Sequence, residues 1–168
     1  MKIIETDRLY LRELTIDDAE HMYHLNSDTE VLKFTGDIPF ESAESAKIFL
    51  KNYDHYKKYG LGRWAVIQKN NQEFLGWCGL KYTAELNEYD VGFRFFKKQW
   101  NKGFATESGK ACINFGFQKL KLKVILGRAK KENKNSIRVL EKIGLTYVKP
   151  FDFQGEEGVI YEIKNMLY

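Results

Sequence analysis

The hydrophobic pattern of the chain changes its period between Glu88 and Leu120, and the change falls just before Gly103. Residues 88–96 form an extended pattern, whereas residues 103–120 carry apolar side chains at helical spacing. A strand, a short Lys/Gly turn and a helix therefore follow one another directly. Free backbone amides and the positive end of the dipole at such a helix start favour an anion. The feature predicts a phosphate-binding turn within an α/β fold.

Three residues of this turn suit close contact with a phosphate. Gly103 lets the backbone approach, Ala105 keeps the adjacent wall small, and Thr106 adds a hydroxyl donor. Glycine before a helix is also ordinary turn chemistry. A P-loop is excluded, because five residues separate Gly103 from Gly109 and Ala111 stands where Ser or Thr must reach magnesium.

The remaining pattern predicts one domain over residues 1–168, with a mixed, mostly antiparallel sheet of six or seven strands and about four helices. A capping box at Thr15 opens the first helix, and glycines after residue 59 end the second. The predicted elements are a strand at 8–14, helices at 15–25 and 42–59, strands at 63–69, 73–83 and 88–96, a helix at 103–120, a strand at 123–129, a helix at 136–143, and strands at 146–151 and 158–164.

Composition narrows the classes of function only slightly. A net charge of +4 gives weak attraction to any polyanion, and no aromatic–basic RNA motif supports nucleic-acid binding. No apolar run approaches the roughly 18 residues that span a membrane. The first eight residues are charged too early for a signal peptide, so we expect a cytoplasmic protein.

Metal and disulfide chemistry have little support in the sequence. Cys78 and Cys112 each lie in an apolar stretch without a C-x-x-C motif, which predicts buried, reduced thiols. His21 and His24 are three residues apart on a helix, but no third ligand has recognisable spacing. We therefore expect no metal site.

Two long motifs lie on either side of the strand predicted after the turn. Residues 100–107 read W-N-K-G-F-A-T-E, and residues 133–145 read N-K-N-S-I-R-V-L-E-K-I-G-L. Together with T-D-R-L-Y-L-R at residues 6–12, they resemble the GCN5-related N-acetyltransferases (GNAT), and more closely their branch that modifies ribosomal-protein N-termini. The resemblance covers nearly the whole chain, with Leu145 replacing the phenylalanine of that branch.

The resemblance implies a GNAT-like domain with a splayed central pair of strands and acetyl-coenzyme A (acetyl-CoA) as co-substrate. The backbone of Phe93, Arg94 and Phe95 would pair with the pantetheine arm, and a backbone amide near Phe95 would polarise the thioester. Asn133 would hydrogen-bond the same arm. The turn amides and a hydroxyl would bind the diphosphate through Asn101, Lys102, Gly103, Phe104, Ala105 and Thr106.

A direct acetyl transfer needs a neutral amine, a polarised thioester and a proton for the departing thiolate. Asp90 stands where relatives often carry the glutamate of E-x-G-Y, and it is the predicted base, directly or through water. Glu88 is the second choice. The alternative for Asp90 is a structural carboxylate paired with Lys81 or Arg94.

The acid differs from that of many relatives, which place a tyrosine seven residues after the asparagine. Leu140 occupies that position, so a tyrosine acid is excluded there. Ser136 is the branch's alternative for contacting the thiol, and it can also act as a helix N-cap. Because a thiol pKa lies near about 8.5, its departure needs only modest assistance.

The expected acceptor is a primary amine, with a protein N-terminus as the first hypothesis, and the protein is expected to be a monomer or homodimer. A small amine such as a polyamine, amino acid or antibiotic is the second hypothesis, and a non-catalytic acyl-CoA-binding module is the third. Phe34, Tyr53 and Tyr56 come from the region that forms the acceptor wall in relatives, although they suit core packing equally well.

Overall fold

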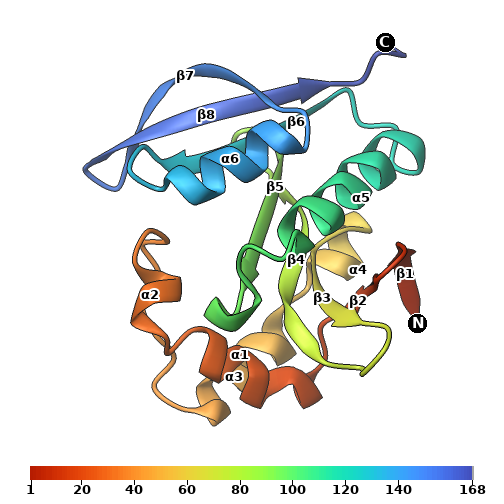
Figure 1. Ribbon diagram of the computed structural model, residues 1–168, viewed down its shortest axis with the longest axis vertical. Helices are drawn as coiled ribbons and strands as arrows, with labels where there is room; N and C mark the ends of the chain where they lie inside the picture. The colour runs from red at the N-terminus through yellow and green to blue at the C-terminus, as the bar shows by residue number, and fades with distance from the viewer. Residues whose placement is uncertain (168) are drawn as a thin grey trace.

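The computed structural model describes residues 1–167 and contains one mixed sheet with the strand order β1-β2-β3-β4-β5-β6-β8-β7 (Figure 1). Neighbouring strands are antiparallel except for β5 and β6, which are parallel. The strands are β1 (Lys2–Glu5), β2 (Leu9–Glu13), β3 (Arg63–Gln68), β4 (Phe74–Thr83), β5 (Glu88–Phe95), β6 (Val124–Lys130), β7 (Thr146–Phe153) and β8 (Glu156–Lys164).

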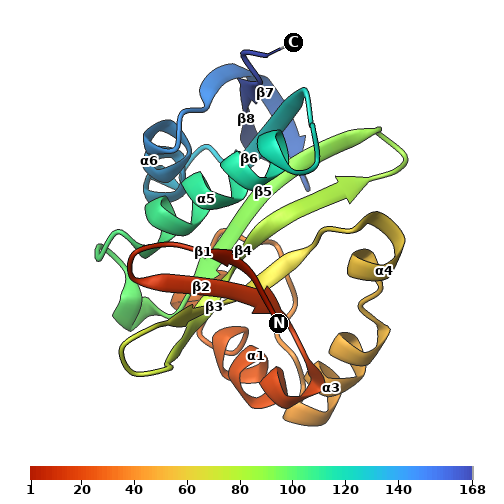
Figure 2. The same cartoon turned by 90° about the vertical axis from the view of Figure 1, so that its right-hand side faces the viewer.

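The α-helices cover both faces of this sheet (Figure 2). They are α1 (Ala19–Leu25), α2 (Thr29–Leu32), α3 (Ala43–Asn52), α4 (His55–Tyr59), α5 (Phe104–Gln118) and α6 (Lys134–Lys142), and short 3-10 turns span Ile16–Asp18 and Lys97–Gln99. The predicted α/β class and mostly antiparallel sheet are confirmed. The sheet has eight strands rather than six or seven, because β1 is a strand of only four residues that the sequence pattern did not reveal.

The predicted helix at 42–59 is two helices instead of one. Ser42 caps α3 as expected, but Tyr53 has extended backbone angles and its hydroxyl accepts the amide N–H of Arg63 at 2.9 Å. This tertiary contact separates α3 from α4. The short helix α2 was not predicted, whereas the capping box at Thr15 is present.

Strand β3 shows why the sheet is buried on both sides. Trp64 and Val66 pack in the core cluster that contains residues of α5, and Ala65 and Ile67 pack in the cluster that contains residues of α1 and α3. All four side chains are at most 3% exposed. Each large apolar side chain buried in this way contributes roughly 1.5–3 kcal/mol. The two helical layers therefore hold β3, β4 and β5 firmly in place.

The expected splay lies between β5 and β6. Asp90 and Leu126 are their one register pair among the described residues, whereas β5 pairs with β4 along its whole length, from Glu88 to Phe95. The C-terminal half of β5 thus carries backbone groups without a strand partner on the β6 side. Buried backbone groups need hydrogen-bond partners, so this half of β5 can accept an extended ligand.

Candidate active site

A cavity of about 980 Å³ lies at the separation of β5 and β6. It brings together five of the residues predicted from the sequence, from both sides of the split and from the first turn of α6. Phe95 does not line it, because its side chain is buried in the core at 5% exposure. The residues of the predicted site that line the cavity are Asp90, Phe93, Arg94, Asn133 and Ser136.

Asp90 contacts two arginines that the sequence did not suggest. Its Oδ1 accepts a hydrogen bond from Nη2 of Arg63, and its Oδ2 lies 4.0 Å from Nη1 of Arg128. The alternative of a structural carboxylate paired with Lys81 or Arg94 is not met among the described residues, where Asp90 pairs with Arg63 and Arg128 instead. The gap of 4.0 Å exceeds a hydrogen bond, so Oδ2 keeps its capacity to accept a proton donor.

Arg63 is fixed by several partners at once. Its Nη1 donates to the carbonyl oxygens of Gly79 at 2.7 Å and Asp90 at 3.2 Å. Burial alone would lower the pKa of Arg63, but attraction to Asp90 and their hydrogen bond raise it on balance. Arg128 also binds Glu88, the second candidate for the base: the Nη2 of Arg128 donates a hydrogen bond to the Glu88 carboxylate. The two carboxylates and two guanidinium groups form one connected chain.

The start of α6 differs from the prediction. The N-cap is Asn133 rather than Ser136, because the Asn133 Oδ1 accepts the amide N–H of Ser136 at 3.2 Å. The helix begins at Lys134, two residues before the predicted start. The Ser136 hydroxyl is therefore not used for capping, and it lies half-buried at the cavity beside Leu140. The amide nitrogen of the Asn133 side chain can still donate to a ligand.

The predicted diphosphate turn lies outside the cavity lining and connects β5 to α5. Asn101 and Gly103 have φ values of 60° and 81°, in the left-handed region that glycine adopts most readily. Gly103 is the N-cap of α5, and within the described chain no side chain caps this helix. The first amides of an α-helix have no partner inside the helix. These amides can therefore bind an anion.

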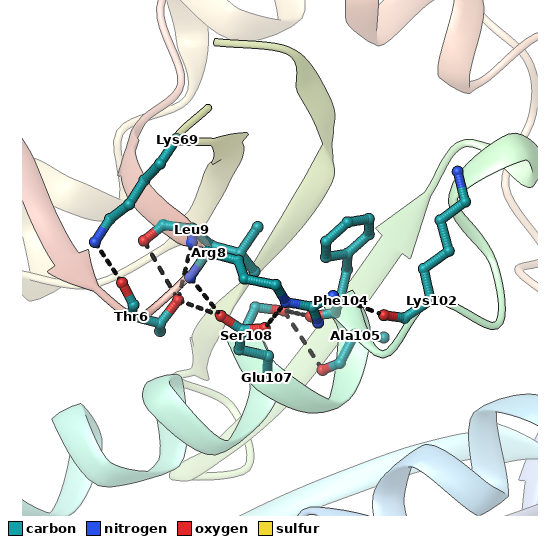
Figure 3. A network of polar contacts seen from close by, with 9 residues as sticks. All are labelled: Thr6, Arg8, Leu9, Lys69, Lys102, Phe104, Ala105, Glu107 and Ser108. Carbon is teal, nitrogen blue, oxygen red and sulfur yellow. Dashed lines mark hydrogen bonds and ion pairs between the residues drawn. The ribbon is translucent and has the colours of Figure 1, made fainter. Parts of the chain in front are cut away.

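The N-terminal hairpin holds this turn from the side, as Figure 3 shows. Arg8 donates from Nε to Glu107 Oε2 at 2.6 Å and from Nη1 to the carbonyl oxygen of Lys102 at 3.1 Å. Thr6 donates its hydroxyl to Glu107 Oε1 at 2.7 Å. Burial would raise the pKa of Glu107, but the hydrogen bonds from Thr6 and Arg8 lower it overall.

Away from Asn133 and Ser136, the cavity is lined by aromatic and charged side chains. Arg94 reaches from β5 to Asn26 Oδ1 at 2.7 Å and to Asp37 Oδ2 at 2.5 Å, so it ties the 26–40 segment to the sheet. Phe34 and Tyr53 line this part of the cavity, in agreement with the prediction of an acceptor wall rather than of core packing alone. Tyr56 is not part of the cavity lining; its hydroxyl donates to the Arg63 carbonyl and accepts the Leu14 amide at 3.1 Å.

Sequence reasoning missed Arg63 and Arg128 as site residues. Both lie in strands whose other residues are mostly apolar, and this isolated charge in a buried strand could have identified them. A guanidinium group in a buried strand requires a carboxylate partner. Pairing the strand arginines with the strand carboxylates would have suggested Asp90 and Glu88 as their partners.

No group of three or more His, Cys, Asp or Glu side chains in residues 1–167 could hold a metal ion. The helices of that same part of the chain include none that is long and apolar enough to cross a membrane. Cys78 and Cys112 are free, buried thiols, with their sulfur atoms 3.7 Å apart.

The splayed pair β5 and β6, the cavity at the split, and a start of α5 that no side chain of the described residues caps are the features that the resemblance to coenzyme A-dependent acyltransferases implies. The sequence profile of the acetyltransferase (GNAT) domain matches residues 8–146. The chain belongs to this family, and it is an N-acetyltransferase that uses acetyl-CoA.

Relatives support this assignment. An uncharacterised N-acetyltransferase of Bacillus subtilis, YnaD, is 33% identical over 84% of this chain and 81% of its own length. The crystal structure of a GNAT acetyltransferase from Bacillus anthracis is 29% identical, with a TM-score of 0.83 over 98% of both chains.

Two more distant structures, both from Vibrio cholerae, share the fold alone. A putative ribosomal-protein-serine acetyltransferase has a TM-score of 0.80 at 21% identity over 98% of both chains. A spermidine N-acetyltransferase in complex with CoA and spermine has a TM-score of 0.79 at 18% identity, covering 95% of this chain and 96% of that one.

Proposed function

We propose that this enzyme transfers the acetyl group of acetyl-CoA directly to the N-terminal amine of a protein, and not to a polyamine. The observation that carries the proposal is the cavity where β5 and β6 separate, because it places Asp90, Asn133 and Ser136 around one space. A direct transfer needs no nucleophilic side chain, so the proposal requires only a base, a hydrogen-bond donor to sulfur and a bound acceptor.

The binding of acetyl-CoA is assigned to two groups of residues. The backbone of Phe93, Arg94 and Phe95, together with the side-chain amide of Asn133, would hold the pantetheine arm along the unpaired half of β5. The amides of residues 101–106 and the Thr106 hydroxyl would bind the diphosphate at the start of α5. Support comes from the missing strand partner of β5 and from the missing side-chain cap of α5 within the described chain.

When bound, acetyl-CoA supplies the thioester carbon to which the amine nitrogen bonds as the carbon–sulfur bond breaks. Asp90 Oδ2 takes the amine proton through a water molecule, since Oδ1 is already held by Arg63. Ser136 donates a hydrogen bond to the departing sulfur, because its hydroxyl is not used for capping. We place this chemistry in the cytoplasm, where acetyl-CoA is made and free thiols such as Cys78 and Cys112 persist.

The charges of the cavity favour an acceptor with one amine over a polyamine. Four cationic side chains (Arg63, Lys81, Arg94 and Arg128) line it together with three carboxylates (Asp37, Asp54 and Asp90). Each carboxylate has a cationic partner within the protein. A polyamine carries several positive charges and needs unpaired carboxylates, because charges that lose water must be paired.

Histidine does not change this balance. Burial and the nearby Lys81 lower the pKa of His55, which leaves the imidazole mostly neutral at pH 7 despite the neighbouring Asp54. The acceptor end therefore offers aromatic surface from Phe34 and Tyr53 and no excess of negative charge. The peptide chain that follows an N-terminal amine need not carry a positive charge, unlike the rest of a polyamine. It therefore suits an aromatic surface without excess negative charge.

A panel of acceptors tests the proposed specificity. We expect thiol release from acetyl-CoA to be at least tenfold faster with N-terminal peptides than with spermidine at equal concentration, which corresponds to about 1.4 kcal/mol of preference. The measurement is continuous thiol detection, with mass spectrometry to locate the acetyl group. Preferred acetylation of spermidine would contradict the proposed acceptor. If only a free amino acid is acetylated, the acceptor is a small amine and not a protein N-terminus.

Replacing Ser136 by alanine tests the proposed contact with sulfur. We expect kcat to fall by about threefold to tenfold, because the thiolate is a fair leaving group that needs only modest help. The melting temperature should stay nearly constant, since Asn133 and not Ser136 caps α6. An unchanged kcat, measured under saturating acetyl-CoA, would remove Ser136 from the mechanism.

A further inference from the structure

Two sequence motifs that are about a hundred residues apart meet at the diphosphate turn. The T-x-R-L segment at residues 6–9 spans the turn between β1 and β2 and the first residue of β2, and the A-T-E segment at residues 105–107 lies in the first turn of α5. Three hydrogen bonds to Glu107 join them, from the Thr6 hydroxyl, the Arg8 amide and the Arg8 Nε, and a fourth runs from the Arg8 Nη1 to the carbonyl oxygen of Lys102. Figure 3 shows these contacts.

The Arg8 side chain bridges the two ends of the turn. On one side it binds the carbonyl oxygen of Lys102, the residue before the N-cap, and on the other it binds the carboxylate of Glu107. Between them, its Nη2 lies 3.3 Å from the position that a Cβ atom on Gly103 would occupy, and its guanidinium lies 4.5 Å from the centroid of the Phe104 ring. The guanidinium group thus covers one side of the turn.

The charge of Glu107 gives this arrangement a second effect. A carboxylate in the first turn of a helix interacts favourably with the helix dipole, and it repels any other anion that binds there. Thr6 and Arg8 occupy both of its oxygens, and Arg8 supplies the compensating positive charge. The free amides at the start of α5 therefore remain available to a diphosphate.

We propose that Arg8, together with Thr6 and Glu107, is a positioning residue that fixes the 101–106 turn for the diphosphate of acetyl-CoA. The inference rests on the proposed function of that turn. Arg8 acts on the turn and not on the reacting atoms, so it sets the affinity for the coenzyme and leaves the chemical step unchanged.

A purely structural role for Arg8 is the weaker explanation. The side chain of Arg8 is 47% exposed and that of Glu107 is 20% exposed, so solvent screening reduces what this pair contributes to stability. The second arginine of the same segment, Arg12, already anchors the hairpin, because it binds both oxygens of the buried Asp18 at 2.7 and 2.8 Å. The hairpin is therefore also held at its other end, by Arg12 and by the pairing of β2 with β3, independently of the Arg8–Glu107 pair.

The test compares two donors, acetyl-CoA and acetylpantetheine, which lacks the diphosphate. Arg8→Ala should raise the KM for acetyl-CoA about tenfold, the size expected for a lost charge-assisted hydrogen bond. The kcat, the KM for the acceptor and the kcat/KM for acetylpantetheine should stay unchanged. Arg8→Lys should give an intermediate KM, because lysine restores the charge but cannot bridge both partners.

Two further variants isolate the charge of Glu107 and the change in net charge. In the Arg8→Ala background, Glu107→Gln should recover part of the affinity for acetyl-CoA, because the uncompensated carboxylate is gone. Lys2→Ala is the matched control: it removes one positive charge from the same hairpin, where Lys2 pairs with Glu5 at 3.1 Å, and should leave the KM unchanged.

The possible failures are distinguishable. If Arg8→Ala weakens the use of acetylpantetheine as much as that of acetyl-CoA, or only lowers the melting temperature, Arg8 is structural and the inference is wrong. The inference also fails if Arg8→Ala leaves the KM for acetyl-CoA unchanged while Gly103→Glu abolishes binding. If Gly103→Glu has no effect either, the proposed role of the turn itself fails.

Discussion

Replacing Gly103 by glutamate is expected to abolish the stabilisation that CoA gives to this protein. At one hundred times its Kd, a ligand stabilises the native state by about 2.7 kcal/mol, which for a chain of this size raises the melting temperature by several degrees. We expect this increase with the original protein and none with Gly103→Glu. The measurement is thermal unfolding with and without CoA.

Backbone strain and charge both contribute to this loss. Gly103 has a φ of 81°, which residues with a Cβ atom adopt at a cost, and the new side chain would start 3.3 Å from Arg8 Nη2. Its carboxylate would lie beside the uncapped amides of α5, where it takes the place of the diphosphate and repels it. An affinity loss of more than about a hundredfold follows from losing these contacts.

Gly155→Glu is the matched control for strain and for charge. Gly155 has a φ of 84°, and a Cβ atom there would meet nothing within 4 Å. It lies in the turn between β7 and β8, away from α5. This variant should unfold at a slightly lower temperature and still gain the full increase with CoA. Retained stabilisation in Gly103→Glu would exclude the turn as the diphosphate site.

The sequence predicts those parts of the site that depend on local pattern. The turn at residues 100–106 could be predicted because a change of period and a glycine before a helix are local features. The long antiparallel strands and α5 were predicted within a few residues for the same reason. The strand β1 was missed because four residues carry too little periodicity, and they form a strand only by pairing with β2.

Other features depend on contacts between distant residues. Arg63 lies 27 residues before Asp90 in the sequence, and the antiparallel pairing of β3, β4 and β5 brings them together. Tyr53 interrupts the predicted helix at 42–59 because its hydroxyl binds the amide of Arg63. The wrong N-cap is a different failure, since Asn133 and Ser136 both suit that position and local chemistry does not choose between them.

Asp90 has the largest expected effect on the reaction itself. Asp90→Asn should lower kcat by about 100-fold to 10,000-fold, the range for a lost general base, and should leave the KM for acetyl-CoA nearly unchanged. Asparagine has the same shape, and its Oδ1 can still accept the hydrogen bond from Arg63. It cannot take a proton from the amine, directly or through water.

The ion pair of Asp90 makes stability part of the same prediction. Removing one partner of a buried pair costs about 3–5 kcal/mol when nothing replaces it. Because the Asp90 side chain is 15% exposed and asparagine keeps one hydrogen bond, the cost should lie below that range. Thermal unfolding in the presence of CoA separates the two effects: a folded, CoA-binding and inactive Asp90→Asn enzyme has lost the chemistry alone.

Glu88→Gln provides the comparison that decides the identity of the base. Glu88 lies two residues earlier on β5 and is held by the same Arg128, so both variants remove one carboxylate from the same chain of charges. Unlike Asp90, it does not line the cavity. We therefore expect Glu88→Gln to keep kcat within about threefold, well below the effect of losing a general base. A larger loss of kcat in Glu88→Gln than in Asp90→Asn would show that Glu88 is the base. A small loss in both variants would mean that water removes the proton and that Arg63 and Asp90 only shape the cavity.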